Sequence, residues 1–584
     1  GNAFTSGIFT TSYSGLTSVE LHSNTAVSNF RTIFTNCLSS ITTVIIGDGV
    51  TEIGANSFNG CNQIQFVTIS NTVTTIGIAA FSHCTKLKDV TVPASVTTIE
   101  EYAFDVSGLE SISILGNVTL GVAIFNYDQS LTTFNLLGNV VSFHTSFLGD
   151  PAHITSVTLG SNSAVNAFTT SYRNKPSVTS VVLTDDVTSI DDNKFQGFTG
   201  LNSVTFGKSV TSIGNFAFSN CNSLPSIDIP NSVTSIGNSA FSGCSRLSML
   251  INIPRNLESI GSSAFYRCSS LGSIIIPNSV KSIGSSAFKE CTGLYSFTIG
   301  NGMISIADEV FYGCIQLETI TIPDNVTSIG NYTFYDCNSL PSIEIPTSLT
   351  SIGNYAFSGC SQLETITIPD NVTTIGSSAF KGCTSLHSFT IGDGITSIAD
   401  EVFNGCSSLP SITIPNNLES IGNSAFSGCS RLTSLEIPNS VQSIGSSAFS
   451  GCSSLQSVIL GSGVNSVNSV FESCANLVTV ELHNNPTVSN FKTIFPTYSN
   501  IQTITLGEGV TEIKKSETDG AFDGCAKLAT VTISEGVTEI GDRAFAQCTA
   551  LASINIPNTV QSIGTNAFCR TKLTSISFPA NLES

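Results

Sequence analysis

The chain has 584 residues, of which 40% are hydrophobic and 11% are charged, and its formal net charge is −20. Soluble globular chains average about 25% charged residues, but the apolar content here is too high for a disordered chain. The acidic balance disfavours nucleic acid and anionic membrane surfaces as partners, and no apolar run reaches the ~18–20 residues that span a bilayer.

Residues 1–84 are predicted to form the N-terminal coils of a repeat array, where a coil is one repeat unit. This stretch contains Val19-Glu-Leu-His-Ser-Asn24 and Val27-Ser-Asn-Phe-Arg-Thr-Ile-Phe34. Gly1 and Ser584 both fall within the repeat pattern. We therefore expect the sequence to be part of a longer protein, with any targeting segment outside it.

Residues 85–200 are predicted to be degenerate coils of the same array. Between Thr85 and Gly200 there is no cysteine, and the phenylalanines are irregularly spaced. We expect continuous but imperfect coils here, with a bend or a bulging loop near Ser161–Pro176.

Residues 201–474 show the repeat most clearly. Nine cysteines from Cys268 to Cys452 are each 23 residues apart, and a phenylalanine stands three residues before most of them. Counted by the phenylalanine or its nearest equivalent, about 24 coils run from Phe34 to Phe568. This period lies within the repeat lengths of solenoid proteins, in which stacked coils share one continuous core.

The coil Leu363–Cys383 indicates how one repeat folds. Residues 366–368 alternate inward, outward and inward, which is the periodicity of a strand. Pro369 cannot donate a ladder hydrogen bond and so ends this first strand. Val372–Ile375 is predicted to be a second short extended segment, and Gly376 to permit a turn.

The phenylalanines and cysteines have the spacing of a helical turn and are predicted to face the core. The core positions named here are Phe288, Cys291, Phe311, Cys314, Phe357, Cys360, Phe380, Cys383, Phe426 and Cys429. Most cysteines form one row with parallel side chains, a geometry that suits a disulfide badly. We predict buried free thiols that pack as small apolar residues.

Residues 475–584 are predicted to be C-terminal coils, continuous with the rest. Val480–Asn485 and Val488–Phe495 repeat the two segments near the start of the chain, and Phe297–Phe311 recurs 92 residues later as Phe389–Phe403. We interpret these recurrences as duplications of four-coil blocks. They either have no functional consequence or give a surface for a repeating, multivalent partner.

The unit Ile-Pro-Asn-Ser-Val-x-Ser-Ile-Gly-x-x-Ala-Phe-x-x-Cys, as in Ile229–Cys244 and Ile437–Cys452, resembles the BspA-like leucine-rich repeats, also called the Treponema pallidum type. The match covers nearly the whole chain and is strongest over Leu201–Ser457. The resemblance implies a mostly β leucine-rich-repeat solenoid, with parallel strands stacked coil on coil and little α-helix. It also implies a surface or secreted protein, often linked to adhesion, and it transfers no catalytic residue.

Metal and catalytic sites find little support in the sequence. No Cys-x-x-Cys or His-Glu-x-x-His spacing occurs, so we predict no enzyme and no cofactor. One acidic cluster consists of Asp185, Asp186, Asp191 and Asp192. Its oxygens could hold Ca²⁺, but a solvated acidic turn is favoured because the spaced Asp-x-Asp-x-Asp pattern is missing.

Four N-glycosylation sequons begin at Asn117, Asn325, Asn331 and Asn371. They are functional only in a eukaryotic secretory protein, and in a chain this rich in asparagine and threonine we expect such sequons to occur by chance.

The outward residues of the first strands form the candidate binding surface, which we call the first-strand face. It consists of Tyr295, Thr298, Glu318, Thr321, Glu344, Glu364, Thr367, His387, Thr390, Thr413 and Glu436. Hydroxyl, carboxylate and occasional aromatic side chains suit a protein or glycan partner. The alternative is that they only keep the sheet soluble and favourable for strands.

The leading functional hypothesis is therefore a non-enzymatic binding or adhesion protein, outside the cell or on its surface. One alternative is a structural subunit of an extracellular coat or filament that self-associates through open sheet edges. Another is an intracellular scaffold, which free thiols would suit.

Overall fold

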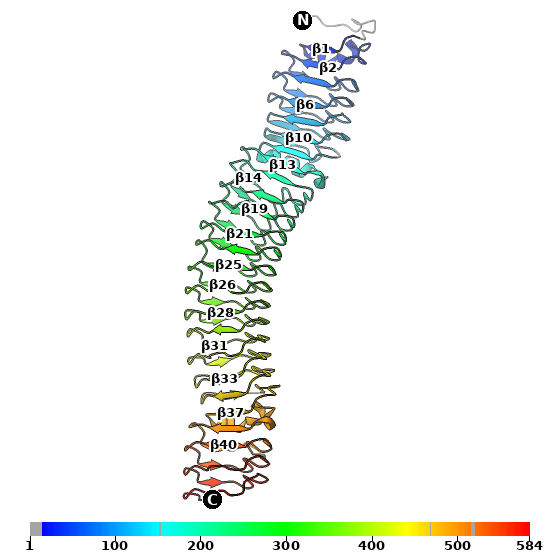
Figure 1. The fold of residues 1–584 in the computed structure, drawn as a ribbon. Coiled ribbons are helices and arrows are strands. Elements are labelled where there is room, and N and C mark those ends of the chain that lie inside the picture. The colour runs from blue at the N-terminus through cyan, green and yellow to red at the C-terminus, as the bar shows by residue number, and fades with distance from the viewer. Residues whose placement is uncertain (1–14, 151–152, 468, 515–519, 584) are drawn as a thin grey trace. The chain divides into compact units, whose positions relative to one another are not determined.

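The computed structural model describes residues 15–150, 153–467, 469–514 and 520–583. The chain divides into two compact units, Gly1–Gly272 and Ser273–Ser584. In each unit the strands of successive coils stack side by side (Figure 1). The fold is mostly β, with 21% strand and 6% helix, and its parallel solenoid has about 23 turns. The predicted fold class is confirmed, with about one turn fewer than the sequence suggested.

In the first unit, the first strands of successive coils pair in parallel. Nine of them form one sheet: β1 (Ser18–Leu21), β2 (Thr43–Ile46), β4 (Phe66–Ile69), β6 (Asp89–Val92), β8 (Ser111–Ile114), β10 (Thr133–Leu136), β12 (Ser156–Leu159), β13 (Ser180–Leu183) and β15 (Ser203–Thr205). Two further strands pair separately: β17 (Ser226–Asp228) and β19 (Met249–Asn252).

The second strands of the first unit are shorter. Before residue 150 they are β3 (Glu52–Ile53), β5 (Thr75–Ile76), β7 (Thr98–Ile99), β9 (Val118–Leu120) and β11 (Val140–Phe143). After it they are β14 (Ser189–Ile190), β16 (Ser212–Ile213), β18 (Ser235–Ile236) and β20 (Ser259–Ile260). Their neighbours in successive coils are also parallel, as in the register of Ser212 with Ser235.

The second unit repeats this plan. Its first strands are β21 (Ser273–Ile275), β23 (Ser296–Thr298), β25 (Thr319–Thr321), β28 (Thr365–Thr367), β30 (Ser388–Thr390), β33 (Ser434–Ile437), β35 (Ser457–Leu460), β37 (Thr479–Leu482), β38 (Thr503–Leu506) and β40 (Thr530–Ile533). Its second strands are β22 (Ser282–Ile283), β24 (Ser305–Ile306), β26 (Ser328–Ile329), β27 (Ser351–Ile352), β29 (Thr374–Ile375), β31 (Ser397–Ile398), β32 (Ser420–Ile421), β34 (Ser443–Ile444), β36 (Ser466–Val467), β39 (Glu512–Ile513), β41 (Glu539–Ile540) and β42 (Ser562–Ile563).

Within the described ranges, helices interrupt the pattern at three places. They are α1 (Asn24–Ser28) with α2 (Phe30–Ile33), α3 (Asn162–Ser171) with the 3-10 helix η1 (Lys175–Ser177), and α4 (Asn485–Ser489) with α5 (Phe491–Ile494) and the 3-10 helix η2 (Tyr498–Asn500). The bulging loop expected near Ser161–Pro176 is therefore wrong, because α3 occupies most of it. Ser161 caps this helix by accepting a hydrogen bond from Ala164 N at 3.1 Å, a bond that serine caps commonly make.

The core is a column of apolar side chains inside the coils. In the second unit Phe357 and Phe380 are fully buried, and their rings stack with centroids 5.2 Å apart and 2° between planes. Phe218 and Phe241 do the same in the first unit, at 5.4 Å and 3°. Burying a side chain of this size contributes about 1.5–3 kcal/mol, so each coil stabilises its neighbour.

Candidate functional site

The first-strand face lies in the second unit, and ten of its eleven residues are exposed, while Thr298 is half-buried. The strands align its threonines, with Thr298 in register with Thr321 and Thr367 in register with Thr390. The face is not one continuous sheet, because the described residues around Glu344 and Thr413 do not form a strand.

Hydroxyl groups on two sides of the coil differ in their hydrogen bonding. Before the second strands, each threonine donates to a carbonyl of the preceding coil: Thr350 Oγ1 to Thr327 O at 2.9 Å, and Thr373 Oγ1 to Thr350 O at 3.3 Å. On the first-strand face, the described part of the chain offers no hydrogen bond to the hydroxyls of Thr298, Thr321, Thr367, Thr390 and Thr413. The first-strand hydroxyls are thus free to bind a partner.

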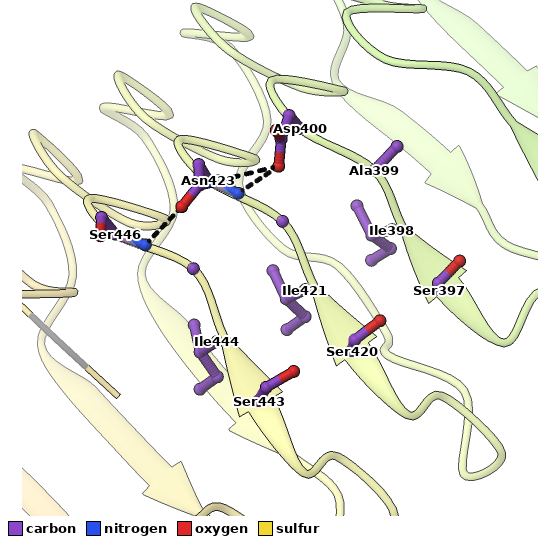
Figure 2. Close-up of a pocket in the computed structure, with 12 residues that line it drawn as sticks. Ser397, Ile398, Ala399, Asp400, Ser420, Ile421, Asn423, Ser443, Ile444 and Ser446 are labelled. Atoms are coloured by element: carbon purple, nitrogen blue, oxygen red, sulfur yellow. Dashed lines mark hydrogen bonds between the residues drawn. The ribbon is translucent and has the colours of Figure 1, made fainter. Parts of the chain in front are cut away.

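The second-strand side carries two grooves that the sequence reasoning missed. The larger holds about 500 Å³ and crosses β31, β32 and β34. Figure 2 shows its two polar walls: a row of serines on the strands, and a second row beyond them of an aspartate, an asparagine and a serine. The residues of these walls are Ser397, Ser420, Ser443, Asp400, Asn423 and Ser446.

The second wall of this groove is a polar ladder in which each side chain binds the next coil. Asp400 Oδ1 accepts from Asn423 N at 2.7 Å, and Asn423 Oδ1 accepts from Ser446 N at 2.9 Å. Glycine lines the groove where adjacent coils approach closely: a Cβ on Gly445 would lie 2.4 Å from Asn423 N. The recurrent Ser-Ile-Gly-Asn tetrapeptide was the available signal for this groove.

A smaller groove of about 380 Å³ crosses β26, β27 and β29 and has the same construction. Its ladder runs from Asp308 to Asn331 N at 2.7 Å, from Asn331 to Asn354 N at 2.8 Å, and from Asn354 to Ser377 N at 2.8 Å. Gly376 belongs to this groove, and a Cβ there would lie 2.4 Å from Asn354 N. The close approach of the adjacent coil therefore explains this glycine, in place of the turn conformation we expected.

The acidic cluster lies on exposed turns of the first unit, and two of its carboxylates hold the backbone of the next coil. Asp185 accepts from Lys208 N at 2.8 Å, and Asp192 accepts from Asn215 N at 2.6 Å. Asp186 and Asp191 are also exposed. Among the residues that the structure describes, no group of three or more His, Cys, Asp or Glu side chains is placed to hold a metal ion.

The side-chain amides of the four sequon asparagines form hydrogen bonds to the backbone of adjacent coils. Asn325 Nδ2 donates to Asn301 O at 2.7 Å, and Asn371 Nδ2 donates to Thr347 O at 2.6 Å. Asn117 Oδ1 accepts from Asn139 N at 3.0 Å, and Asn331 belongs to the polar ladder of the smaller groove. These contacts give each asparagine a role in joining coils.

The cysteines are free, and 17 of the 18 are buried, with Cys569 exposed. Cys383 Sγ donates to Phe357 O of the preceding coil at 3.2 Å, and Cys314 Sγ does the same to Phe288 O at 3.2 Å. Burial raises the pKa of the Cys383 thiol well above its usual range. Such thiols are protonated and unreactive at neutral pH, so this row joins coils and offers no nucleophile.

The fold and the repeat define a leucine-rich-repeat solenoid. The family model described as BspA type leucine rich repeat region (6 copies) matches residues 8–162, 167–295, 281–410, 396–518 and 492–584. This chain belongs to the BspA-type leucine-rich repeat family, a family of repeat scaffolds of the protein-binding kind. In the described ranges, no helix is both long and apolar enough to cross a membrane.

Several solved structures are similar to this chain. A leucine-rich repeat protein from Bacteroides ovatus is 31% identical, over 57% of this chain and 93% of its own, with a TM-score of 0.49. A leucine-rich repeat protein from T. pallidum is 32% identical, over 27% and 77%, with a TM-score of 0.26. A leucine rich cell surface protein from Faecalibacterium prausnitzii is 26% identical, over 54% and 90%, with a TM-score of 0.34. No curated protein matches the chain.

Proposed function

We propose that this chain is a non-enzymatic binding protein, displayed on a cell surface or secreted, that presents its first-strand face to a protein or glycan partner. The observation that carries the proposal is the row of threonines, exposed except for half-buried Thr298, whose hydroxyls make no hydrogen bond within the described coils. The chemically identical threonines beside the second strands use their hydroxyls to join coils. Hydroxyls left free in register on neighbouring strands give a partner repeated donors and acceptors.

Other features support a binding surface over a reaction. Burial raises the pKa of Cys406 to about 12 and that of Cys383 well above its usual range, so these thiols supply no thiolate. Exposed carboxylates such as Glu318 and Glu364 lie beside the threonines, and mixed hydroxyl and carboxylate surfaces recognise polar partners by hydrogen bonding.

Binding is best tested with a pair of matched variants. Thr367→Val with Thr390→Val removes two free hydroxyls while keeping a β-branched side chain. Thr350→Val with Thr373→Val removes two hydroxyls that join coils. Both proteins and the natural chain would be screened against immobilised matrix proteins, host cells and a glycan array. We expect the first variant to lose binding to the partner found, and the second to lose stability while retaining binding.

A partner that binds both variants equally well would rule out the first-strand face as its site. The cellular location needs a separate measurement, protease shaving of intact cells followed by detection of peptides from this chain. We expect peptides to be released without lysis. Peptides found only after lysis would contradict the surface location and direct the search to intracellular partners.

A further inference from the structure

Four tyrosines gather on the turn side of three successive coils in the second unit. They are Tyr312, Tyr332, Tyr335 and Tyr355, out of 11 in the whole chain. The rings of Tyr312 and Tyr335 stack with centroids 4.7 Å apart, and those of Tyr332 and Tyr355 stack at 4.8 Å. Tyr332 and Tyr335 join the two stacks at 5.8 Å. We call these four residues the tyrosine cluster, and all four are half-buried.

The repeat does not require tyrosine at these positions. Two coils use Ser358 and Ser378 at the equivalent places, and both serines are buried. Tyr332 and Tyr355 also adopt left-handed backbone conformations, each with φ of 53°. This conformation belongs to the repeat, because the equivalent Ser378 and Ser424 also have positive φ, of 57° and 50°.

A salt bridge brackets the cluster on each side. Lys289 pairs with Glu309 at 2.7 Å on one side, and Lys381 pairs with Glu401 on the other. Lys289 Nζ also lies 4.1 Å from the centroid of the Tyr312 ring. One ring of the cluster, that of Tyr312, therefore already packs against a cation of its own chain. The two glutamates, Glu309 and Glu401, are both neutralised by lysines.

Asp336 lies beside the tyrosine cluster, and its carboxylate has no hydrogen-bond or salt-bridge partner in the described coils. It follows Tyr335 directly and takes the place that Gly313 and Gly359 hold in the coils on either side. The Asp336 Oδ1 atom lies close to Gly359: a Cβ added to that glycine would be 2.1 Å from this oxygen. Burial raises the pKa of Asp336, and its negative charge raises the pKa of Tyr335.

We infer that the tyrosine cluster binds an arginine or lysine side chain from a basic segment of a partner protein, with Asp336 pairing the cation and the tyrosine rings packing against it. The stack that begins under Lys289 ends at Tyr335, because the next coil supplies only Ser358. A cation beside Tyr335 would reach both an aromatic ring and an unpaired carboxylate, the two groups that attract it. The net charge of −20 steers basic partners toward the chain. This surface is separate from the first-strand face.

The inference can be tested by fluorescence anisotropy with the full chain at near-physiological ionic strength. The probe is a fluorescein-labelled peptide with two arginines separated by glycines, and its matched control has citrulline in place of arginine. We expect the citrulline peptide to bind about tenfold more weakly, since it keeps the shape and loses the charge. Equal binding of the two peptides would overturn the inference.

Variants then locate the site. Tyr335→Ser with Asp336→Gly installs the residues that the next coil carries at these positions, Ser358 and Gly359, so the coil is expected to fold. We expect it to bind the arginine peptide about tenfold more weakly. Tyr102→Ser is the control for loss of a tyrosine elsewhere on the chain, because Tyr102 holds the repeat position of Tyr332 and Tyr355 in the first unit, with φ of 57° and 40% exposure. It should bind as the natural chain does.

An unchanged affinity in the double variant would also overturn the inference, because it would show that the arginine peptide is held by the overall negative charge. The first-strand variant Thr367→Val with Thr390→Val is expected to bind the peptide normally. Failure of the surface-binding proposal and failure of this inference therefore give different results.

Discussion

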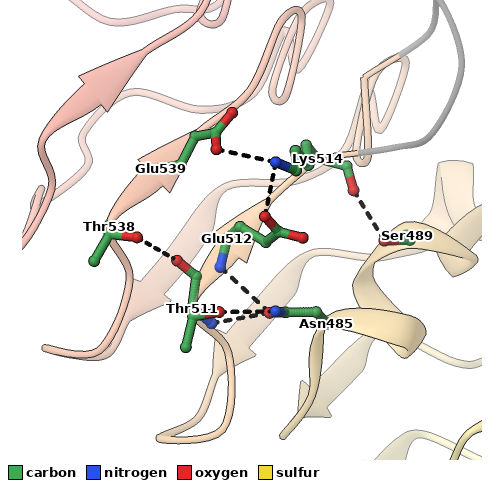
Figure 3. Close-up of polar contacts among 7 residues, drawn as sticks. All are labelled: Asn485, Ser489, Thr511, Glu512, Lys514, Thr538 and Glu539. Carbon is green, nitrogen blue, oxygen red and sulfur yellow. Dashed lines mark hydrogen bonds and ion pairs between the residues drawn. The ribbon is translucent and has the colours of Figure 1, made fainter.

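Asn485 binds Thr511 through both ends of its side-chain amide. Its Oδ1 accepts from Thr511 N at 2.9 Å, and its Nδ2 donates to Thr511 Oγ1 at 2.8 Å (Figure 3). The same pairing occurs twice in the first unit, where Asn24 accepts from Thr51 N and Asn162 accepts from Thr188 N, both at 2.8 Å. Each asparagine begins a helix that takes the place of a second strand, so its side chain makes the bonds to the next coil.

Replacing Asn485 with alanine should loosen the following coil. The backbone N–H groups of Thr511 and Glu512 would lose their acceptor, a cost of about 1–3 kcal/mol for buried donors and less where water replaces it. Hydrogen exchange followed by mass spectrometry should show faster exchange around residues 511–513. Asn371→Ala is the control, because its exposed amide makes one bond to Thr347 O. Unchanged exchange in Asn485→Ala would mean that packing of α4 alone holds the coil.

Two glycines of one coil should respond very differently to alanine. A Cβ on Gly445 would meet backbone at 2.4 Å, whereas a Cβ on Gly451 would have its nearest neighbour, Gly428 N, at 3.6 Å. Gly451 has φ of +73°, so alanine there costs about 1–2 kcal/mol. We expect Gly445→Ala to cost about 3 kcal/mol or more, because two coils must separate. Denaturant unfolding of the two variants decides this, and equal losses would contradict the close approach.

Stability near Asp128 should depend on pH. The side chain is fully buried, and its partners are Ser107 Oγ at 2.6 Å and Ser130 N at 3.4 Å. Burial raises the pKa of Asp128 to about 7, against about 3.9 in an unfolded chain. The stabilising contribution is therefore complete below about pH 4 and is lost as the pH rises through about 7, by at most about 1.4 kcal/mol per pH unit.

Asp128→Asn isolates this effect from other titrations. In the natural chain we expect residues 107–131 to be better protected from hydrogen exchange at pH 5 than at pH 7, after correction for the intrinsic exchange rate. In the Asp128→Asn variant we expect protection to be the same at both pH values. A natural chain whose local protection depends on pH no more than that of the variant would show that Asp128 does not titrate between pH 5 and 7. Lys88 is the nearby cation that lowers the pKa of Asp128.

Thiol reactivity should separate one cysteine from the rest. Cys569 is exposed, and the other 17 cysteines are buried. Burial also raises the pKa of the Cys548 thiol to about 12. Under native conditions a thiol reagent such as Ellman's should label Cys569 alone, and after unfolding it should label all 18. Rapid native labelling of a cysteine such as Cys383 would contradict the buried row.

The sequence predicted those features that repeat within one coil. The alternation at 366–368 is seen as buried Ile366, exposed Thr367 and buried Ile368. This signal suffices because strand periodicity and core packing depend on residues close together in the chain. The exposure of the first-strand residues follows from the same alternation, and whether they bind a partner remains a prediction.

Features that depend on contact between coils could not be predicted in the same way. The role of Gly376 is set by Asn354 N in the preceding coil, a contact that the recurrent Ser-Ile-Gly-Asn tetrapeptide marks but does not explain. The polar grooves have the same origin. The helices could have been predicted, because Val27, Phe30 and Phe34 have helical spacing. Their recurrence as Val488, Phe491 and Phe495 was interpreted only as a duplication.

The polar ladder has a direction, and that direction bears on how such a chain can grow. Asp308 begins one ladder, which ends at Ser377, and Asp400 begins the next ladder one coil later. An internal coil such as that of Asn354 both receives a bond from the coil before it and makes one to the coil after it. Such a coil can be copied or deleted as a whole without leaving an unmatched end. Recombination between near-identical coils would therefore change the length of the array while each new junction keeps its hydrogen bonds.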